Sequence, residues 1–317
     1  MRTKTFYQVA LFFLVVAVIM WVLLPITPLI ANAGIGNPNY SITTKVNVTN
    51  APPQVTNVVT STPITLTANA TAYTECNATV SDLNGATDMA SVNATFFDSV
   101  FSQSSAQEDN TTHYSNVSCT NFSDVDSITR LYSCGFNINY NANPGNWTCN
   151  VTAVDTKNVA TADNGTSSIN QLIALYVDEL LDFGQIGAGN TTNNILFNIT
   201  NVGNRGMNVS VYTYGRTDND SLAMVCEFGN ISIGNLKVTT QFNISNDTQF
   251  LIPFSQMTTV NNSNATSTRI GNLTVLQFNN TYVNSINTTA WRLNVPLQGV
   301  PSGVCNGTLV FRASKGV

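Results

Sequence analysis

The feature that most limits the fold of this chain is a series of short runs in which polar and apolar residues alternate. Alternation places successive side chains on opposite faces of a strand, as in Glu75–Val80, where Cys76, Ala78 and Val80 share one face. The apolar spacing of three and four that marks a helix occurs only in a short stretch near Leu172–Leu181. Turns rich in Asn, Gly and Pro separate the runs. The pattern predicts an all-β protein.

The predicted strands fall into two groups, each typical of a β-sandwich, with about seven short strands in roughly 120–140 residues. We therefore predict two tandem sandwiches, residues 61–177 and 178–317, after a polar lead (34–60) that is either a linker or a first edge strand. The strands expected in the first sandwich are Ile64–Asn69, Glu75–Val80, Val92–Phe97, Tyr132–Tyr140, Trp147–Asp155 and Ile169–Val177. Those expected in the second are Ile195–Asn201, Met207–Tyr214, Leu222–Phe228, Leu236–Phe242, Leu273–Phe278, Ala290–Pro296 and Thr308–Ala313.

The N-terminus carries the one apolar run of near-membrane length. Residues 9–24 are uncharged and apolar, and Arg2 and Lys4 precede them. A cleaved signal peptide (1–33) is favoured by two prolines after the run and by the small-residue site Ala31-Asn32-Ala33. A retained hydrophobic anchor helix through residues 6–30 is favoured by the length of the run, because a span needs about 20 residues, and it would leave the N-terminus in the cytoplasm. Both alternatives export the rest of the chain to the cell surface or beyond it.

Charged residues are scarce, and this excludes several classes of protein. Only 12 Lys or Arg and 17 Asp or Glu occur among 317 residues, about 9%, and the formal net charge is −5. A typical soluble domain carries about 25% charged residues. A nucleic-acid partner is excluded because phosphate binding needs a basic patch. The 43% of hydrophobic residues argues against disorder, because such a chain can bury a core.

Six cysteines without a Cys-x-x-Cys pair predict disulfides in an exported chain rather than a zinc site. Six cysteines allow 15 connectivities. Strand alternation places Cys76 and Cys149 on inward faces, early and late in the first sandwich, which suits a bridge between its sheets. Cys119 and Cys134 flank a short loop that they can close, and Cys226 and Cys305 remain for the second sandwich. We therefore prefer the pairs Cys76–Cys149, Cys119–Cys134 and Cys226–Cys305.

Asn-x-Ser/Thr triplets predict a surface dense in N-linked glycans. The triplet occurs 24 times, whereas 44 Asn, 42 Thr and 25 Ser would produce about nine by chance. In 15 of the 24 the middle residue is apolar or aromatic, so on a strand the Asn faces water while the middle residue faces the core. The candidate attachment sites are Asn69, Asn77, Asn93, Asn116, Asn146, Asn150, Asn198, Asn208, Asn230, Asn243, Asn272 and Asn306.

Three segments resemble immunoglobulin-like modules of exported surface proteins. The segment Tyr140–Asp155 resembles the corner and the strand that carry the second cysteine of such domains. Leu181-Asp182-Phe183-Gly184 with Asn198–Asn204 is similar to the opening of microbial surface modules, and Trp291–Phe311 to their terminal hairpin. With the Asn- and Thr-rich composition, the chain resembles archaeal exported cell-surface glycoproteins with tandem immunoglobulin-like β-sandwiches. The resemblance implies a structural or adhesive role and no catalytic residues.

Catalytic and metal sites find little support in the sequence. The one histidine, His113, stands in a polar stretch where we expect a solvated side chain, and no Gly-x-Ser-x-Gly nucleophile motif accompanies it. The pairs Asp124/Asp126 and Asp218/Asp220 are expected in solvated turns. Asp82, Asn84, Gly85 and Asp88 offer oxygen ligands but not the order of an EF-hand, so an ordinary turn is favoured over a calcium site. We predict no enzyme activity, metal or cofactor.

The sequence favours an exported, N-glycosylated surface protein with a structural or adhesive role. Its expected partners are other surface proteins or copies of itself, together with the membrane if the anchor is retained. An alternative is the subunit of an extracellular filament, in which the lead (Ser41–Val59) adds a strand to a neighbour's sheet. A receptor or solute-binding ectodomain and a hydrolase are weaker alternatives, because each would need a cleft that the sequence does not indicate.

Overall fold

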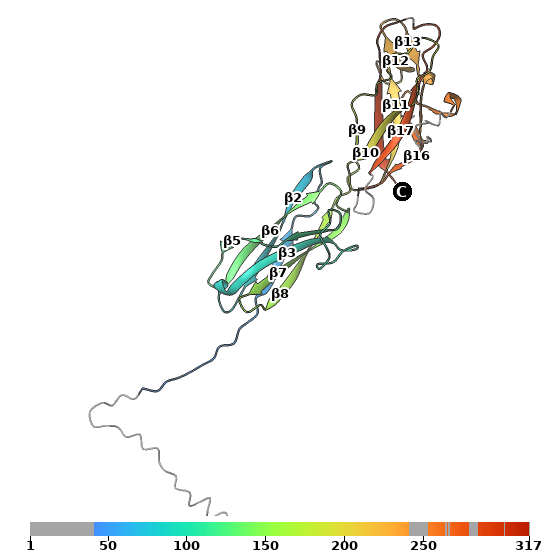
Figure 1. Ribbon diagram of the computed structural model, residues 1–317. Coiled ribbons are helices and arrows are strands. Elements are labelled where there is room, and N and C mark those ends of the chain that lie inside the picture. The colour runs from blue at the N-terminus through green and yellow to red at the C-terminus, as the bar shows by residue number, and fades with distance from the viewer. Residues whose placement is uncertain are drawn as a thin grey trace, which may run out of the picture. The chain divides into compact units, whose positions relative to one another are not determined.

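A computed structural model describes residues 41–240, 253–263, 265, 267–278, 285–300 and 302–316 (Figure 1). The expected signal peptide or anchor at 1–33 therefore lies outside the described residues. Within the described part of the chain, no helix is long and apolar enough to cross a membrane. Residues 41–49 are extended and exposed, without regular secondary structure. The rest of the described chain consists of antiparallel strands, turns and three short 3₁₀ segments, as an all-β protein requires.

The first sandwich consists of two four-stranded antiparallel sheets (Figure 1). One sheet has the order β1-β2-β6-β5 and the other the order β4-β3-β7-β8. When the strands are lettered in chain order, the first sheet consists of strands A, B, E and D and the second of strands C′, C, F and G, as in an immunoglobulin-like domain. The strands are β1 Gln54–Thr60, β2 Thr71–Ser81, β3 Met89–Asp98, β4 His113–Asn116, β5 Thr120–Asp124, β6 Thr129–Asn139, β7 Gly145–Asp155 and β8 Ala160–Ile169.

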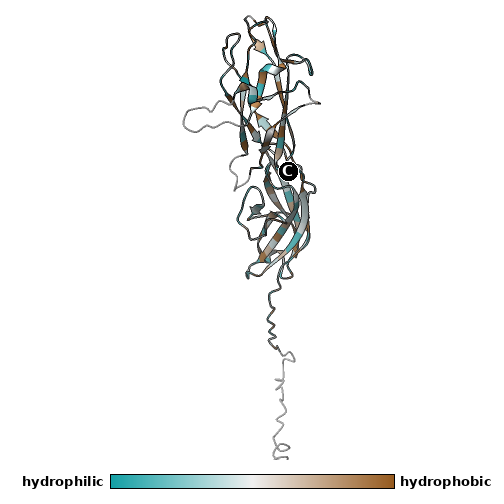
Figure 2. Ribbon diagram, turned by 90° about the vertical axis from the view of Figure 1, so that its right-hand side faces the viewer, coloured by the Kyte–Doolittle hydropathy of each residue, from teal (hydrophilic) through white to brown (hydrophobic). Residues whose placement is uncertain are grey.

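Alternation along the long central strands builds the first core. In β7 the residues Trp147, Cys149, Val151 and Ala153 are each fully buried, and the residues between them are partly exposed. Figure 2 shows the same succession of hydrophobic and hydrophilic residues along the strands. The Trp147 ring stacks on Phe96 of β3 with centroids 4.9 Å apart, and its Nε1 donates a hydrogen bond to the Asn143 carbonyl at 2.9 Å. Trp147 thus occupies the position, two residues before the strand-F cysteine, where immunoglobulin domains carry the tyrosine of their E–F corner.

The second sandwich contains a five-stranded sheet, β15-β14-β17-β10-β9, and a three-stranded sheet, β16-β11-β19. A further small sheet has the order β13-β12-β18. Trp291, Ile199 and Val238 from the larger sheet share a buried cluster with Met207 and Val211 of β11. The strands are β9 Leu175–Val177, β10 Ile195–Asn201, β11 Met207–Tyr214, β12 Leu222–Cys226, β13 Asn230–Ser232, β14 Leu236–Thr239, β15 Thr258–Thr259, β16 Thr268–Val275, β17 Ile286–Leu293, β18 Cys305–Asn306 and β19 Thr308–Lys315.

Several predicted strand positions need correction. Ile64–Asn69 is not a strand but forms one isolated bridge, between Ile64 and Ile169. Part of the lead, Gln54–Thr60, is the edge strand β1 of the first sandwich. The expected strand Ile169–Val177 is divided, because β8 ends at Ile169 and β9 pairs with β10 in the second sandwich. The sequence also missed β4, β5, β8, β13, β15 and β18, which are short or rich in polar residues.

Candidate functional site

The sequon asparagines lie at the surface wherever their side chains are described. Of the 24, 18 have a described side chain: 13 are exposed, five are partly exposed and none is buried. Of the candidate attachment sites, Asn243 lies outside the described residues and Asn272 belongs to β16 without a described side chain. The exposed candidates are Asn69, Asn77, Asn146, Asn198, Asn230 and Asn306, and the partly exposed ones are Asn93, Asn116, Asn150 and Asn208.

The buried asparagines form a separate group, since none of Asn141, Asn194, Asn201 and Asn204 belongs to a sequon. Asn201 shows what such a residue does: its Nδ2 donates to the carbonyls of Arg205 at 2.8 Å and of Val275 and Leu276 at 3.2 Å. Its Oδ1 accepts the Gly203 amide at 2.9 Å. Asn201 thus stabilises a turn from the interior, whereas the sequon asparagines with described side chains are exposed or partly exposed.

The expectation that the middle residue of a sequon faces the core holds on the regular strands and fails elsewhere. The buried middle residues are Ala78, Ala94, Trp147, Val151, Ile199, Val209, Ile231 and Leu273. The exposed ones are Val48, Ala70, Val117, Phe122 and Ala265. Val48 belongs to the extended lead and Phe122 to the exposed edge strand β5, while Ala70 and Val117 precede strands in turns. Val48, Ala70, Val117 and Ala265 lie outside paired strands and have no opposite face to bury, whereas Phe122 lies at an irregularity in the pairing of β5 with β6, between Asn121 and Ser123.

All six cysteines are joined in disulfides, as Cys76–Cys149, Cys119–Cys134 and Cys226–Cys305. The first joins β2 to β7 and so links the two sheets of the first sandwich, with both residues fully buried. The second ties the segment before β5 to β6, and the third joins β12 to β18, where the two cysteines are paired in register. Three disulfides and no free cysteine indicate an oxidising compartment.

His113 corrects the expectation of a solvated histidine. Its side chain is only 2% exposed at the start of β4 and stacks on Phe97, with ring centroids 6.3 Å apart. Nε2 lies 3.4 Å from the Ser104 carbonyl, and Nδ1 is buried without a hydrogen-bond partner. The burial and the contact with Phe97 make the ring part of the interior at this edge of the sheet.

The predicted aspartate pairs organise turns. Asp124 forms an ion pair with Arg130 at 2.8 Å, and Asp126 accepts the Ile128 amide at 2.9 Å. Asp220 accepts four backbone amides, those of Gly215, Arg216, Thr217 and Leu222. Partial burial raises the pKa of Asp220, but these donated hydrogen bonds outweigh that effect and hold its pKa below the ordinary value.

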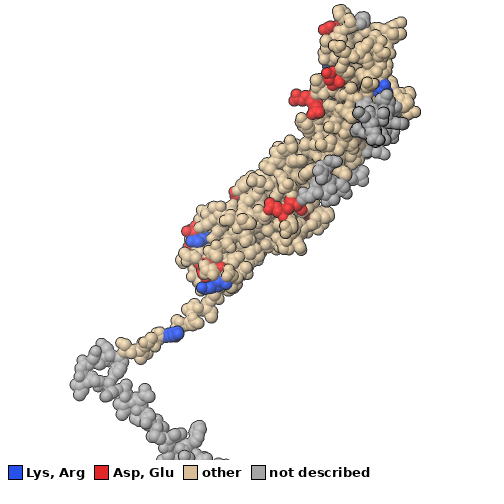
Figure 3. Space-filling view, viewed as in Figure 1, with Lys and Arg blue, Asp and Glu red and all other residues tan. Residues whose placement is uncertain are grey.

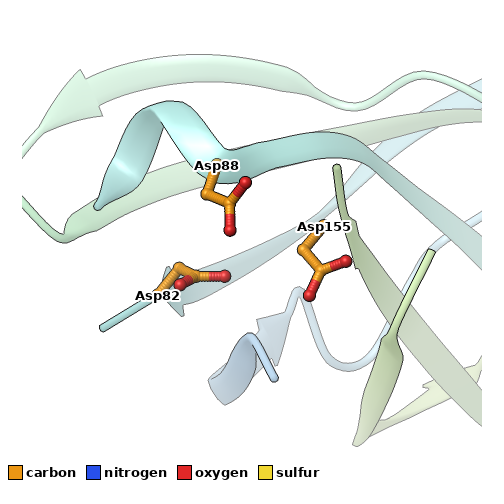
Figure 4. A group of neighbouring side chains, drawn as sticks. All are labelled: Asp82, Asp88 and Asp155. Atoms are coloured by element: carbon orange, nitrogen blue, oxygen red, sulfur yellow. The ribbon is translucent and has the colours of Figure 1, made fainter. Parts of the chain in front are cut away.

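The Asp82 turn forms as predicted, and the fold adds a third carboxylate to it. Asp82 Oδ1 accepts the Asn84 amide at 2.7 Å, and Gly85 adopts a φ of 117°, which favours glycine. The turn leads through the 3₁₀ segment Ala86–Asp88 into β3. Asp155, the last residue of β7, lies beside the other two acids, and Figure 4 shows the three carboxylates around a common space.

A groove of about 280 Å³ lies on the second sandwich, between the edge strands of its two main sheets. Val177 of β9 and the segment 178–183 form one wall, and Gly307, Thr308 and Leu309 at the start of β19 form the other. Apolar core residues, among them Phe197, Leu236 and Phe311, line its floor. Asp178 and Glu179 are the charged residues in the lining. Among the described strands, β9 and β19 end their sheets on this side.

Comparison with known proteins gives no family for this chain. No family model matches it, and none of the curated proteins matches significantly. Among solved structures, it is similar to the chaperone–tip adhesion subunit pre-assembly complex of the archaic chaperone–usher Csu pili of Acinetobacter baumannii. The identity is 12% and the TM-score 0.34, over 80% of this chain and 99% of that one.

Two further solved structures are similar to this chain at comparably low identity and TM-score. A chaperone–tip adhesin complex of CFA/I fimbriae biogenesis matches with 9% identity and a TM-score of 0.30, over 81% of this chain and 79% of the other. Chimeric titin Z1Z2, functionalised with a decorin peptide, matches with 12% identity and a TM-score of 0.21, over 56% and 78%. Scores this low carry no functional inference. What the structure itself defines is a disulfide-bonded all-β protein whose first sandwich is immunoglobulin-like.

Proposed function

We propose that this chain is an exported, N-glycosylated cell-surface protein with a structural or adhesive, non-catalytic role. The observation that carries the proposal is that every sequon asparagine whose side chain is described is exposed or partly exposed, while the buried asparagines lie outside sequons. The three disulfides and the low content of charged residues support the same location. Figure 3 shows how sparse the charged side chains are on one face.

The mass of the native protein tests this proposal. Glycopeptide mass spectrometry of protein purified from the cells that make it should find sugar on most of the exposed candidates, such as Asn77, Asn198 and Asn306. Asn141, which is buried and outside any sequon, serves as the internal control and should be unmodified. A native protein whose mass equals that of its unmodified polypeptide would contradict the proposal. Surface labelling of intact cells should reach the same peptides.

The groove and the lead together favour a second candidate function, a filament subunit that adds a strand to a neighbouring copy. In the lead, Ile42, Thr44, Val46 and Val48 alternate with polar residues and therefore share one face of an extended strand. Ile42, Val46 and Val48 are 84%, 83% and 76% exposed, so the described residues leave this face uncovered. The groove on the second sandwich offers an open sheet edge above an apolar floor.

Length and charge agree with this pairing between copies. Strand β19 has eight residues, and the exposed residues 41–50 are long enough to pair along it. Lys45 is the only charged residue of that lead segment, whereas the groove is lined by Asp178 and Glu179. The donor is shorter than the predicted Ser41–Val59, because Gln54–Thr60 already pairs with β2 of its own sandwich.

Electron microscopy of the purified full-length protein tests the filament candidate. The double variant Val46→Asp/Val48→Asp places charge on the apolar face and should abolish filaments while leaving a folded monomer. The matched control is Thr43→Asp, which adds a charge to the opposite face of the same segment. Filaments that persist in the double variant, or a native protein that stays monomeric at high concentration, would exclude strand addition by the lead.

A further inference from the structure

Three carboxylates that are distant in sequence meet at one end of the first sandwich. Asp82 follows β2, Asp88 ends the 3₁₀ segment before β3, and Asp155 ends β7. One ligand oxygen from each lies within 4.8 Å of the others. The register of β3 against β7 explains the meeting, because Met89 is paired with Asp155 and the Thr156 amide donates to the Asp88 carbonyl at 2.8 Å.

The group lies largely out of solvent. Asp82 is 1% exposed and Asp155 is not exposed at all, while Asp88 is partly exposed and closes the group toward the solvent. Burying an ionised carboxylate costs several kcal/mol unless it is paired, hydrogen-bonded or bound to a metal. Three neighbouring carboxylates also repel one another, so the arrangement requires some compensation.

Hydrogen bonds within the protein compensate part of this charge and hold the carboxylates in place. Asp155 Oδ1 accepts the amides of Lys157 and Val159 at 2.8 and 2.9 Å, and its Oδ2 accepts Asn50 Nδ2 at 2.7 Å. Asp82 Oδ1 accepts the Asn84 amide, and Asp88 Oδ1 accepts the Thr156 hydroxyl. These hydrogen bonds fix the orientation of the carboxylates but do not neutralise their negative charges.

One oxygen is left without a partner, and it belongs to a buried residue of the group. Asp82 Oδ2 is buried and has no hydrogen-bond partner. Figure 4 shows the Asp82 carboxylate directed toward the space between the three residues. The ion pair of Arg130 with Asp124 does not involve this group. The positive charge of Lys157 has an attractive electrostatic effect on Asp155.

We infer that Asp82, Asp88 and Asp155 bind a divalent cation, and that the cation is calcium. Calcium takes oxygen ligands at about 2.3–2.6 Å, so two oxygens on one ion lie at most about 4.6–5.2 Å apart. The separations in this group satisfy that limit. Backbone carbonyls and water supply the remaining ligands in flexible calcium sites, whereas magnesium demands near-octahedral geometry and retains most of its water. Sites of this type in extracellular modules bind calcium with Kd of about 10⁻⁴–10⁻³ M.

The position of the site gives the ion a local structural role. Asn50 donates to Asp155, and the Ala51 amide donates to Asn84 Oδ1 at 2.7 Å. The group is thus bordered by the residues that lead into β1, by the β2–β3 turn and by the β7–β8 turn. A bound cation would hold these three segments together at one end of the sandwich and would stabilise the folded state relative to the unfolded one.

Thermal unfolding of the full-length protein with and without calcium tests the inference. At a calcium concentration 100-fold above Kd, the ratio of folded to unfolded protein should rise about 100-fold, which appears as a higher Tm than in chelator. Magnesium at the same concentration should produce a smaller rise, and NaCl at matched ionic strength should produce none. Calorimetric titration with CaCl₂ measures the affinity directly.

The variant Asp82→Asn separates a cation site from a purely structural group. It removes one charge from the group while retaining its shape and the Oδ1 that accepts the Asn84 amide. In chelator it should be at least as stable as the wild type, because repulsion is reduced, and calcium should no longer raise its Tm. The matched control is Asp163→Asn, an exposed carboxylate on β8 outside the group, which should retain the full calcium response.

Two results would overturn the inference. An equal wild-type Tm in calcium and in chelator would mean that the charge is compensated by a shared proton rather than by a cation. A full calcium response in Asp82→Asn would place the responsible site elsewhere on the chain. Both results are independent of glycosylation and of filament formation.

Discussion

At the scale of single residues, asparagine has two separate functions in this chain. The sequon asparagines with described side chains, such as Asn198, are exposed or partly exposed, and buried asparagines such as Asn201 and Asn204 satisfy backbone groups in turns. A buried backbone carbonyl or amide without a partner is costly, so a side chain with two donors and an acceptor suits such turns. The Asn-x-Ser/Thr triplets identify the first group, the sequon asparagines, in the sequence. The second group is not marked by such a triplet, and its partners lie both close in the chain, as Gly203 does for Asn201, and far away, as Val275 does.

The substitution Asn201→Ala should destabilise the second sandwich by about 2–3 kcal/mol, because it leaves the Gly203 amide and the carbonyls of Val275 and Leu276 without their partner. Denaturant titration measures the change in the free energy of unfolding. Asn193→Ala is the control, since Asn193 is exposed and outside any sequon, and it should change stability by less than about 0.5 kcal/mol. Equal stability of the two variants would contradict the role assigned to Asn201.

The turn that Asp220 stabilises should lose stability at low pH. Burial raises the pKa of Asp220, but the four donated amides lower it further, so its folded-state pKa lies below the unfolded value of about 3.9. The ionised carboxylate therefore stabilises the fold above that pH, and the contribution is lost as the pH falls through the folded-state pKa. Asp220→Asn should be less stable than the wild type at pH 7, and the difference should shrink below about pH 4. A difference that is constant from pH 7 to pH 2 would show that ionisation is irrelevant.

At the scale of elements, the sequence predicted strands well where one face is buried. The limits of β10 and β11 agree with the prediction, because Ile195–Asn201 and Met207–Tyr214 alternate regularly and end at turns. Strand β8 escaped detection because its residues are small and polar, and it is held by pairing with β7 along its whole length. Such edge strands derive their structure from the neighbouring backbone rather than from their own side chains.

Sequence reasoning also found only part of the acidic group that Asp82, Asp88 and Asp155 form. The sequence placed Asp82 and Asp88 in one turn, because they are close in the chain and flank Gly85. Asp155 lies 67 residues after Asp88, and only the register of β3 against β7 brings it into the group. Register depends on tertiary pairing, so a single sequence does not contain this information in a local pattern.

The disulfides should contribute unequally to stability. Cys76–Cys149 closes 73 residues and Cys119–Cys134 closes 15, so loop entropy assigns them about 4.4 and 3 kcal/mol. The double variant Cys76→Ala/Cys149→Ala should therefore lose more stability than Cys119→Ala/Cys134→Ala, by at least about 1 kcal/mol, and more if the buried pair leaves a cavity. Denaturant titration under non-reducing conditions measures both. A larger loss in the short-loop variant would contradict the entropic ranking.

At the scale of the whole molecule, the low charge leaves solubility to other groups. Twelve basic and 17 acidic side chains are dispersed over 317 residues, and apolar side chains such as Val117, Leu180 and Leu297 are more than 70% exposed. Net charge and charged surface normally keep a protein of this size in solution. N-linked glycans on the exposed sequons would supply the hydration that charged side chains supply elsewhere, and would cover apolar residues between strands.

The folded but unglycosylated chain should therefore be poorly soluble. Protein made in a host without N-glycosylation should aggregate at concentrations at which the native protein is monodisperse, and more strongly as acidification below pH 5 reduces the net charge of −5 toward zero. Light scattering measures the aggregation, and circular dichroism with thermal unfolding must show that both forms are equally folded. An unglycosylated chain that remains folded and monodisperse would show that the polar Asn, Thr and Ser side chains suffice, and the density of sequons would then need another explanation.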